Sequence, residues 1–159
     1  MGDYGNRPVN SGSTSLNTTA LKVAIVVSEW NSEITEALYS GAVETLLKQG
    51  ILSENIIRKD VPGSYELPLA TQWLANNVDV SAVLALGCVI QGETRHFDFI
   101  CQAVAQGIMD VNLKTNKPVI FGVLTTDTKQ QALDRAGGKH GNKGEEAAWS
   151  ALKMLNIKQ

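Results

Sequence analysis

Apolar runs and helical stripes alternate along the chain. Three runs are apolar at nearly every position, as is typical of strands covered on both faces, at residues 21–27, 81–90 and 118–124, and a shorter mixed run at residues 56–61 is expected to form a further strand. The segments between the runs repeat apolar residues at helical spacing, and the clearest stripe is Ile100, Val104, Ile108 and Val111. The pattern therefore predicts four strands, each followed by a helix.

Turn and cap residues set the expected limits of these helices. The helix after the first strand runs to about residue 49, where Gly50 closes it. After the second strand, residues 62–63 turn the chain, and Ser64 is expected to cap a helix through residue 76. Asp127 is expected to cap a short helix to residue 135, and the Gly-rich loop 137–144 leads into a last helix through residue 155.

Strands that alternate with helices at this spacing favour right-handed crossovers and a parallel sheet with helices on both faces. The expected fold class is α/β, a three-layer α/β/α sandwich with a four-stranded parallel sheet, flavodoxin-like in architecture. Residues 1–19 are rich in Gly, Ser, Asn and Thr, so we expect a flexible N-terminal arm. Residues 20–159 form one domain.

Composition narrows the range of partners. The chain has 159 residues, of which 43% are hydrophobic, and this is enough to bury one substantial core. The formal net charge of −2 and the dispersed Lys and Arg residues disfavour nucleic-acid binding. Long apolar runs and a signal peptide are absent from the sequence, so we expect no membrane association and a cytoplasmic protein. Two histidines without an acidic cluster predict no metal site, and Cys88 and Cys101 are expected to pack as small apolar residues.

The segment after the third strand carries the clearest chemistry. Parallel sheets place ligands at the carboxyl ends of their strands. Gly92, Glu93 and Thr94 lie where a strand ends and a helix begins, so their backbone N–H groups are candidates to hold a phosphate or carboxylate. His96 is expected in the first turn of that helix, and imidazole changes charge near neutral pH. It is the candidate proton shuttle.

Aromatic residues differ in their expected roles. Trp30 stands in a polar loop after the first strand, where it is either a stacking platform for a planar heterocycle or a lid over the edge of the core. Trp73 and Trp149 fall on predicted helix faces among leucines, so we expect them in the core.

Polar residues near other strand ends leave two interpretations open. Ser64 and Glu66 are able to bind a polar ligand, but their spacing favours a helix cap with an acidic first turn. Arg135 is able either to pair with a phosphate or to bond the last carbonyls of its helix. Lys143 lies in the Gly-rich loop, where a solvated charge is the favoured interpretation.

Four motifs follow one another in a recognisable order, namely VVSEWN, VPGSYELP, GCVIQGETRHFDFI and ALDRAGGKHGNKGEEAA. Over residues 21 to about 154 the chain resembles the 6,7-dimethyl-8-ribityllumazine synthases of riboflavin biosynthesis. The resemblance implies a transferase that condenses 5-amino-6-ribitylaminouracil with 3,4-dihydroxy-2-butanone 4-phosphate, releasing phosphate and water. It implies no metal or organic cofactor.

The resemblance also implies roles for residues at matching positions. Trp30 takes the place of the aromatic residue that stacks on the pyrimidine. His96 matches the proposed general acid/base, and Gly92, Glu93 and Thr94 match the phosphate-binding turn. The remaining matches are Asn31, Ser64, Glu66, Val89 and Ile90 around the pyrimidine and ribityl chain, with Phe121, Arg135, Lys143 and Glu146 from the adjoining subunit.

Two residues depart from the family pattern. Trp30 replaces a common Phe, which keeps stacking but enlarges the platform. Glu93 replaces a small residue of many members, and its carboxylate would repel a phosphate unless it pointed away. We expect an outward carboxylate, because the turn binds through backbone N–H groups.

The resemblance implies a homo-oligomer with active sites between subunits. The family forms pentamers and shells of sixty subunits, and the short segment 137–144 favours the shell. Riboflavin synthase is a possible partner, and the N-terminal arm would be able to lie along a neighbouring sheet edge. An alternative keeps the fold without efficient catalysis: a weakly active shell protein that binds flavin or lumazine.

Overall fold

The computed structural model describes residues 16–158. Its main strands are β1 (Val23–Ser28), β2 (Ile56–Val61), β3 (Ala82–Ile90) and β4 (Val119–Thr126). Its helices are α1 (Ser32–Lys48), α2 (Leu67–Ala75), α3 (His96–Thr115), α4 (Lys129–Leu133) and α5 (Lys143–Ile157). Short 3₁₀ turns lie at Thr18–Ala20 (η1), Ser53–Asn55 (η2) and Ser64–Glu66 (η3). Each predicted strand and helix is present.

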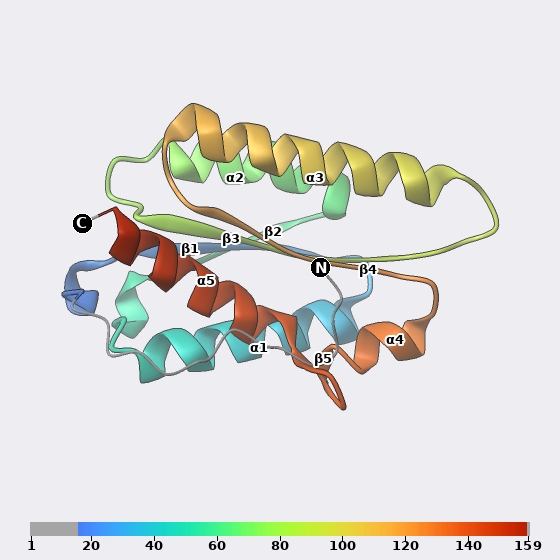
Figure 1. Ribbon diagram of the computed structural model, residues 1–159, viewed down its shortest axis with the longest axis horizontal. Coiled ribbons are helices and arrows are strands. Elements are labelled where there is room, and N and C mark those ends of the chain that lie inside the picture. The colour runs from blue at the N-terminus through green and yellow to red at the C-terminus, as the bar shows by residue number, and fades with distance from the viewer. Residues whose placement is uncertain (1–15, 159) are drawn as a thin grey trace.

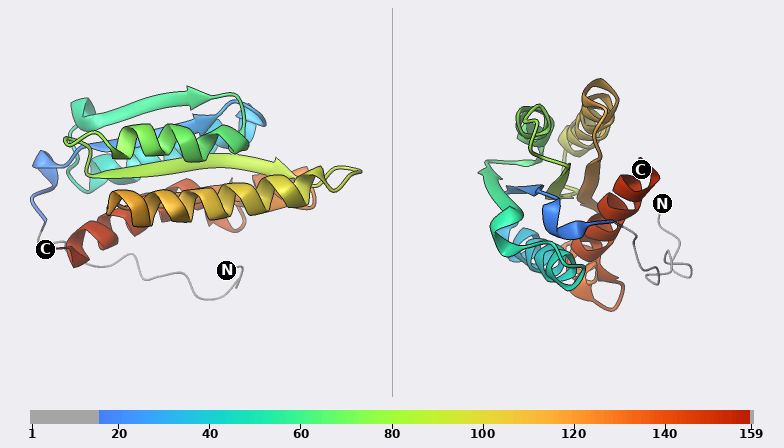
Figure 2. Two further views of the ribbon diagram at one scale, coloured as in Figure 1. Left: turned by 90° about the horizontal axis from the view of Figure 1, so that it is seen from above. Right: turned by 90° about the vertical axis from the view of Figure 1, so that its left-hand side faces the viewer.

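The four strands form one parallel sheet in the order β2-β1-β3-β4. Helices α2 and α3 cover one face of the sheet, and α1, α4 and α5 cover the other (Figure 1). Seen from the end, the sheet separates the two helical layers (Figure 2). The predicted three-layer α/β/α, flavodoxin-like fold is confirmed, and the carboxyl ends of all four strands share one edge of the sheet.

The apolar runs arise because the central strands are buried on both faces. In β1, Val23, Ile25 and Val27 pack in the core shared with α1 and α5. Ala24 and Val26 face the other core, together with residues of α2 and α3. Alternate residues of a strand point to opposite faces, so a strand between two helical layers has apolar residues at successive positions.

Two predicted caps are wrong. The first turn after β2 is capped from Glu66, whose Oε2 accepts a hydrogen bond from the Gly63 N–H at 3.0 Å, and Ser64 is buried instead. Helix α4 is capped by Thr128 rather than Asp127, because the Thr128 hydroxyl accepts from the Gln131 N–H at 3.2 Å. Sequence alone does not decide which of several neighbouring polar residues has the extended backbone that a cap requires.

The Gly-rich loop 137–144 forms more structure than expected. It contains part of a small antiparallel hairpin of β5 (Ala136–Gly138) and β6 (Gly141–Asn142), and its last two residues begin α5. Gly137 and Gly141 have φ values of +111° and +79°, a region that favours glycine. The glycines therefore build a tight hairpin rather than an open loop.

The N-terminal arm falls mostly outside the described residues, since residues 1–15 are not among them. From residue 16 onward the chain packs against the domain. Leu16 is buried in the core on the α1 and α5 side, and Asn55 donates its side-chain amide to the Thr19 carbonyl at 3.0 Å. Residues 16–19 therefore belong to the folded part of the chain.

The expected burial of Trp73 is wrong, because its side chain is 66% exposed. Helix α2 buries Leu67, Thr71 and Ala75 against the sheet, and Trp73 lies on the opposite side of the helix with Leu69. Trp149 on α5 is half-buried. A short helix with apolar residues on both sides gives no periodicity that tells the inner face from the outer one.

Candidate active site at the carboxyl edge of the sheet

Hydrogen bonds bring three loops together where the strands end. The Glu29 N–H donates to the Val61 carbonyl at 2.8 Å, which joins the loop after β1 to the end of β2. The Asn31 side-chain amide donates to the Cys88 carbonyl at 3.0 Å, which joins the same loop to β3. The Gln91 N–H donates to the Thr126 carbonyl at 2.8 Å, at the end of β4. The predicted convergence at this edge is present.

Trp30 offers an accessible aromatic surface at the convergence. Its side chain is 73% exposed, so it is not a lid over the core. Its backbone N–H donates to the Pro62 carbonyl at 3.2 Å, and its side-chain Cδ1 lies 3.4 Å from the position that a Cβ on Gly63 would occupy. The indole therefore lies beside the turn after β2 at ordinary contact distance and remains open to solvent.

Ser64 and Glu66 are held differently in the turn after β2. Ser64 is only 6% exposed, and its Oγ lies 2.6 Å from the position that a Cβ on Gly87 would occupy. Glu66 is exposed, and its carboxylate caps the turn through Gly63. The cap interpretation is correct for Glu66 and leaves one carboxylate oxygen without a part in that bond.

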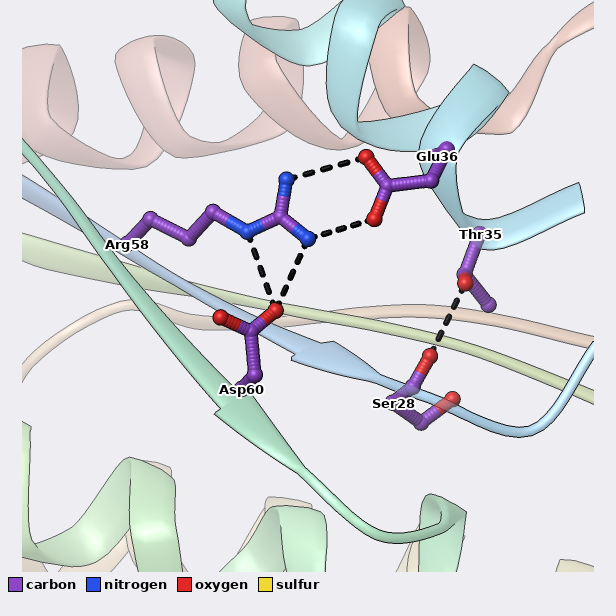
Figure 3. A network of polar contacts seen from close by, with 5 residues as sticks. All are labelled: Ser28, Thr35, Glu36, Arg58 and Asp60. Carbon is purple, nitrogen blue, oxygen red and sulfur yellow. Dashed lines mark hydrogen bonds and ion pairs between the residues drawn. The ribbon is translucent and has the colours of Figure 1, made fainter. Parts of the chain in front are cut away.

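Ser28 is a polar group at this edge that the sequence analysis did not single out. It is the last residue of β1 and fully buried, and its carbonyl accepts from the Thr35 hydroxyl at 2.8 Å (Figure 3). Its own Oγ has no hydrogen-bond partner within residues 16–158 and lies 3.3 Å from the same Gly87 position as Ser64. The sequence signal that could have identified Ser28 is its position as a polar residue at the end of an apolar run.

The loop between β3 and α3 carries the anion candidates. Gly92, Glu93 and Thr94 are exposed, and the loop projects beyond the end of the helical layers (Figures 1 and 2). Helix α3 begins at His96, as predicted, with Arg95 at its N-cap position. The His96 N–H points back to the Thr94 hydroxyl at 3.4 Å. The imidazole is thus exposed at the helix start, next to the turn.

Val89 and Ile90 end β3 beside this loop. They pair in register with Thr125 and Thr126 of β4 and are half-buried, in contrast to the fully covered residues before them. The structure therefore places their backbone at the rim of the site.

Phe121, Arg135, Lys143 and Glu146 lie on other elements. Phe121 pairs with Ala85 five positions before the end of β4, which is ~16 Å along a strand. The Arg135 Nη1 donates to the Gln131 carbonyl at 2.9 Å, and Lys143 pairs with Glu146 at 2.6 Å. The hairpin β5–β6 lies on the α1 side of the sheet, away from the projecting β3–α3 loop (Figure 1).

Both cysteine thiols have raised pKa values. Burial raises the pKa of the Cys88 thiol to about 11, and burial also raises the pKa of Cys101, with a further contribution from Asp98. Neither thiol is therefore an activated nucleophile.

Across residues 16–158, no group of three His, Cys, Asp or Glu side chains is arranged to hold a metal ion. None of the described helices is long and apolar enough to cross a membrane.

Comparison with known proteins gives a consistent result. The sequence profile of the family described as 6,7-dimethyl-8-ribityllumazine synthase matches residues 20–159. A protein of that name from Cytophaga hutchinsonii is 70% identical over 139 residues, covering 87% of each chain. Proteins of the same name from Porphyromonas gingivalis and Parabacteroides distasonis are 55% and 53% identical, over 87% and 86% of this chain and 86% of each relative. The chain that folds into this sandwich therefore belongs to the 6,7-dimethyl-8-ribityllumazine synthase family.

Proposed function

We propose that the chain carries out the family's condensation at the carboxyl edge of its sheet, with the pyrimidine against Trp30 and the phosphate at residues 92–94. The substrates are 5-amino-6-ribitylaminouracil and 3,4-dihydroxy-2-butanone 4-phosphate. The observation that carries this assignment is the meeting of three loops, which sets an exposed indole, an open glycine turn and a helix-start histidine on one edge.

The chemistry asks for positioning and proton transfer. The 5-amino nitrogen bonds to the ketone carbon, and loss of water leaves an imine. Loss of a proton and of phosphate from adjacent carbons gives an enol, which tautomerises to a ketone. The ribitylamino nitrogen then attacks this ketone, and loss of a second water closes the ring. No protein nucleophile is required, so holding the two substrates together supplies much of the acceleration.

His96 is assigned the proton transfers. It is the first residue of α3 and follows Gly92 by four positions, so its imidazole would lie beside a phosphate bound at residues 92–94. Glu93, Thr94 and Gly92 would meet the phosphate through backbone N–H groups, with the exposed Glu93 carboxylate free to turn to solvent. Ser64, Glu66, Asn31, Val89 and Ile90 would frame the pyrimidine and its ribityl chain.

The test of this assignment is turnover with both substrates, followed by lumazine absorbance. His96→Ala is expected to lower kcat by about 10²-fold while leaving both KM values nearly unchanged. His96→Gln is the matched variant, because it retains a hydrogen-bonding side chain but does not titrate. A His96→Ala protein with unchanged kcat across neutral pH would remove His96 from the mechanism.

The proposed function includes a homo-oligomer whose active sites are shared between neighbouring subunits. Phe121 lies too far along β4 to line the site of its own chain, so it is available to the site of a neighbour. In that neighbouring site Arg135 would pair with the substrate phosphate, and Lys143 and Glu146 would line the pocket. Helices α2 and α3 pack side by side (Figure 2) and, with η3, expose apolar side chains on their outer surface, namely Tyr65, Leu69, Trp73, Phe99, Met109 and Leu113. Exposed apolar surface of this extent is typical of an interface.

The proposed assembly is a pentamer that associates further into a shell of sixty subunits. The compact hairpin β5–β6 leaves no long insertion between α4 and α5 to obstruct contacts between pentamers. Riboflavin synthase would be the natural cargo of such a shell, because it consumes the product. Native mass spectrometry tests the assembly: a mass near five chains rejects the shell, and an active monomer rejects the shared site.

A further inference from the structure

Asn142 is a buried polar residue outside the carboxyl-edge cluster, and both ends of its amide are occupied. It is 8% exposed and stands at the N-cap of α5. Its Oδ1 accepts from the Gly144 N–H at 2.8 Å and the Glu145 N–H at 3.4 Å. Its Nδ2 donates to the Ala37 carbonyl of α1 at 2.9 Å. One side chain therefore caps one helix and fastens that helix to another.

The contact between these helices leaves little room for movement. A Cβ on Gly41 of α1 would lie 2.6 Å from the Asn142 Cγ, and a Cβ on Gly144 would lie 1.8 Å from the Leu38 carbonyl oxygen. Both distances are below the contact that real atoms tolerate. The start of α5 therefore packs against the α1 backbone at Gly144, and the Asn142 amide packs against α1 at Gly41.

This contact is connected to two cationic residues of the proposed site. In the β5–β6 hairpin Asn142 pairs with Ala136, and Ala136 is the residue directly after Arg135. Lys143 follows Asn142 directly, and its N–H donates to the Arg135 carbonyl at 2.9 Å. Arg135 and Lys143 are therefore each one residue from the hairpin pair that the Asn142 amide holds on α1.

We propose that Asn142 is a positioning residue, which sets the location of Arg135 and Lys143 for the phosphate-bearing substrate by fastening the β5–β6 hairpin to α1. This inference rests on the proposed function, in which both cations line a site. Guanidinium and ammonium groups bind phosphate only when their geometry is correct, so a displaced hairpin weakens phosphate binding without touching the pyrimidine.

Asn142→Asp keeps the side-chain cap of α5 but removes the hydrogen bond to the Ala37 carbonyl of α1. A carboxylate still accepts the α5 N–H bonds, and it favours a helix start, so α5 is expected to persist. The donor to Ala37 is lost, and two oxygens face each other instead. We expect the KM of the butanone phosphate to rise by about three- to tenfold, the worth of one such hydrogen bond, with the pyrimidine KM changed by less than about twofold.

Gly41→Ala approaches the same contact from α1 and keeps the test informative if the first variant folds poorly. Its methyl group would displace the Asn142 side chain, while alanine favours a helix more than glycine does. The same split between the two KM values is expected. If both variants are folded by circular dichroism and neither raises the KM of the butanone phosphate, the inference is overturned.

Asn112→Asp is the matched control. Asn112 is another asparagine with both amide ends bonded: its Nδ2 donates to the Ile108 and Val119 carbonyls, and its Oδ1 accepts from the Val119 N–H at 2.7 Å. Asn112 lies on α3 and contacts the start of β4, at the end of the sheet opposite the carboxyl edge. We expect reduced stability with no split between the KM values. A split in this control would show that general destabilisation produces the effect, and would overturn the inference.

Combining Asn142→Asp with Arg135→Ala and Lys143→Ala separates the inference from the proposed function. If Asn142 acts through these two cations, it adds less than about twofold to the KM of the butanone phosphate once both are gone. Full additivity overturns the inference alone. If Arg135→Ala by itself leaves that KM unchanged, the assignment of Arg135 in the proposed function is wrong, and the inference fails with it.

Discussion

The side-chain amide of Asn31 donates a hydrogen bond to the backbone carbonyl of Cys88, 3.0 Å away. This bond ties the loop after β1, which carries Trp30, to the end of β3, which leads to the phosphate turn. Asn31 also has a φ of 60°, a left-handed conformation that asparagine tolerates better than most residues. Its position thus determines how the two proposed substrate subsites face each other.

Asn31→Asp is expected to weaken both folding and pyrimidine binding. Aspartate tolerates the same backbone conformation but cannot donate to Cys88, and its carboxylate would face the carbonyl oxygen. We expect the free energy of unfolding to fall by about 1–3 kcal/mol and the pyrimidine KM to rise. Urea unfolding at fixed protein concentration and steady-state kinetics measure the two effects.

Asn116→Asp is the control for this prediction. Asn116 is the other non-glycine residue with positive φ among residues 16–158, and it lies after α3, away from the carboxyl edge. It is expected to leave both KM values unchanged. If Asn31→Asp behaves in the same way, Asn31 has no part in arranging the site.

The fold was predictable because burial on both faces leaves a strong mark on the sequence. The run 81–90 became β3, and the stripe of Val104, Ile108 and Val111 became the buried side of α3. Features that depend on tertiary contacts were not predictable. The Ser28 hydroxyl has no hydrogen-bond partner among residues 16–158, and the Asn142 amide lies between two helices, and both features arise from segments distant in sequence.

The same distinction holds for the site. Trp30 and His96 could be named as candidates, and their positions in an exposed loop and at a helix start predicted, because an aromatic residue in a polar loop and a titratable residue at a helix start stand out locally. Trp73 was misassigned, since a two-sided apolar helix needs its neighbours to define an inside. The hairpin that precedes Lys143 was expected as a loop because glycine signals a turn without specifying which one.

Removing the Glu36 carboxylate is expected to produce a pH-dependent loss of stability. Arg58 donates to Glu36 and Asp60 and lies 4.4 Å above the Tyr39 ring, so it joins edge strand β2 to α1 (Figure 3). The hydrogen bond from Arg58 lowers the pKa of the Glu36 carboxyl below its usual value. A lowered folded-state pKa stabilises the fold above the unfolded value, and this stabilisation is lost as pH falls through the folded pKa.

Glu36→Gln should therefore reduce the free energy of unfolding by about 0.2–1 kcal/mol at neutral pH, and by less in high salt. The difference from the unmodified protein should vanish in acid. Glu44→Gln is the matched control, because Glu44 pairs with one lysine on the same exposed helix face, and it should have a smaller effect. A loss for Glu36→Gln that is independent of pH would contradict the role of charge.

Cys88 is expected to resist alkylation in the folded protein. Burial raises its pKa to about 11, so almost no reactive thiolate is present at neutral pH, and the side chain is covered. Cys101 is half-buried on α3 and should react first with iodoacetamide. Peptide mass mapping after timed labelling gives both rates, and unfolding in urea should make them equal. Equal rates in the folded protein would contradict the burial of Cys88.

Trp30→Ala is expected to weaken binding of the pyrimidine and of planar flavin-like ligands by about three- to tenfold, the contribution of one aromatic stack. Trp30→Phe should retain most of the affinity, because a smaller ring still stacks. Ligand binding should quench the tryptophan emission of the unmodified protein, and both variants report how much of that quenching comes from Trp30. Trp73 and Trp149 remain as emitters in each, and Trp73 is 66% exposed on the outer side of α2. Undiminished quenching in Trp30→Ala, together with unchanged affinity, would place the pyrimidine elsewhere on the carboxyl edge.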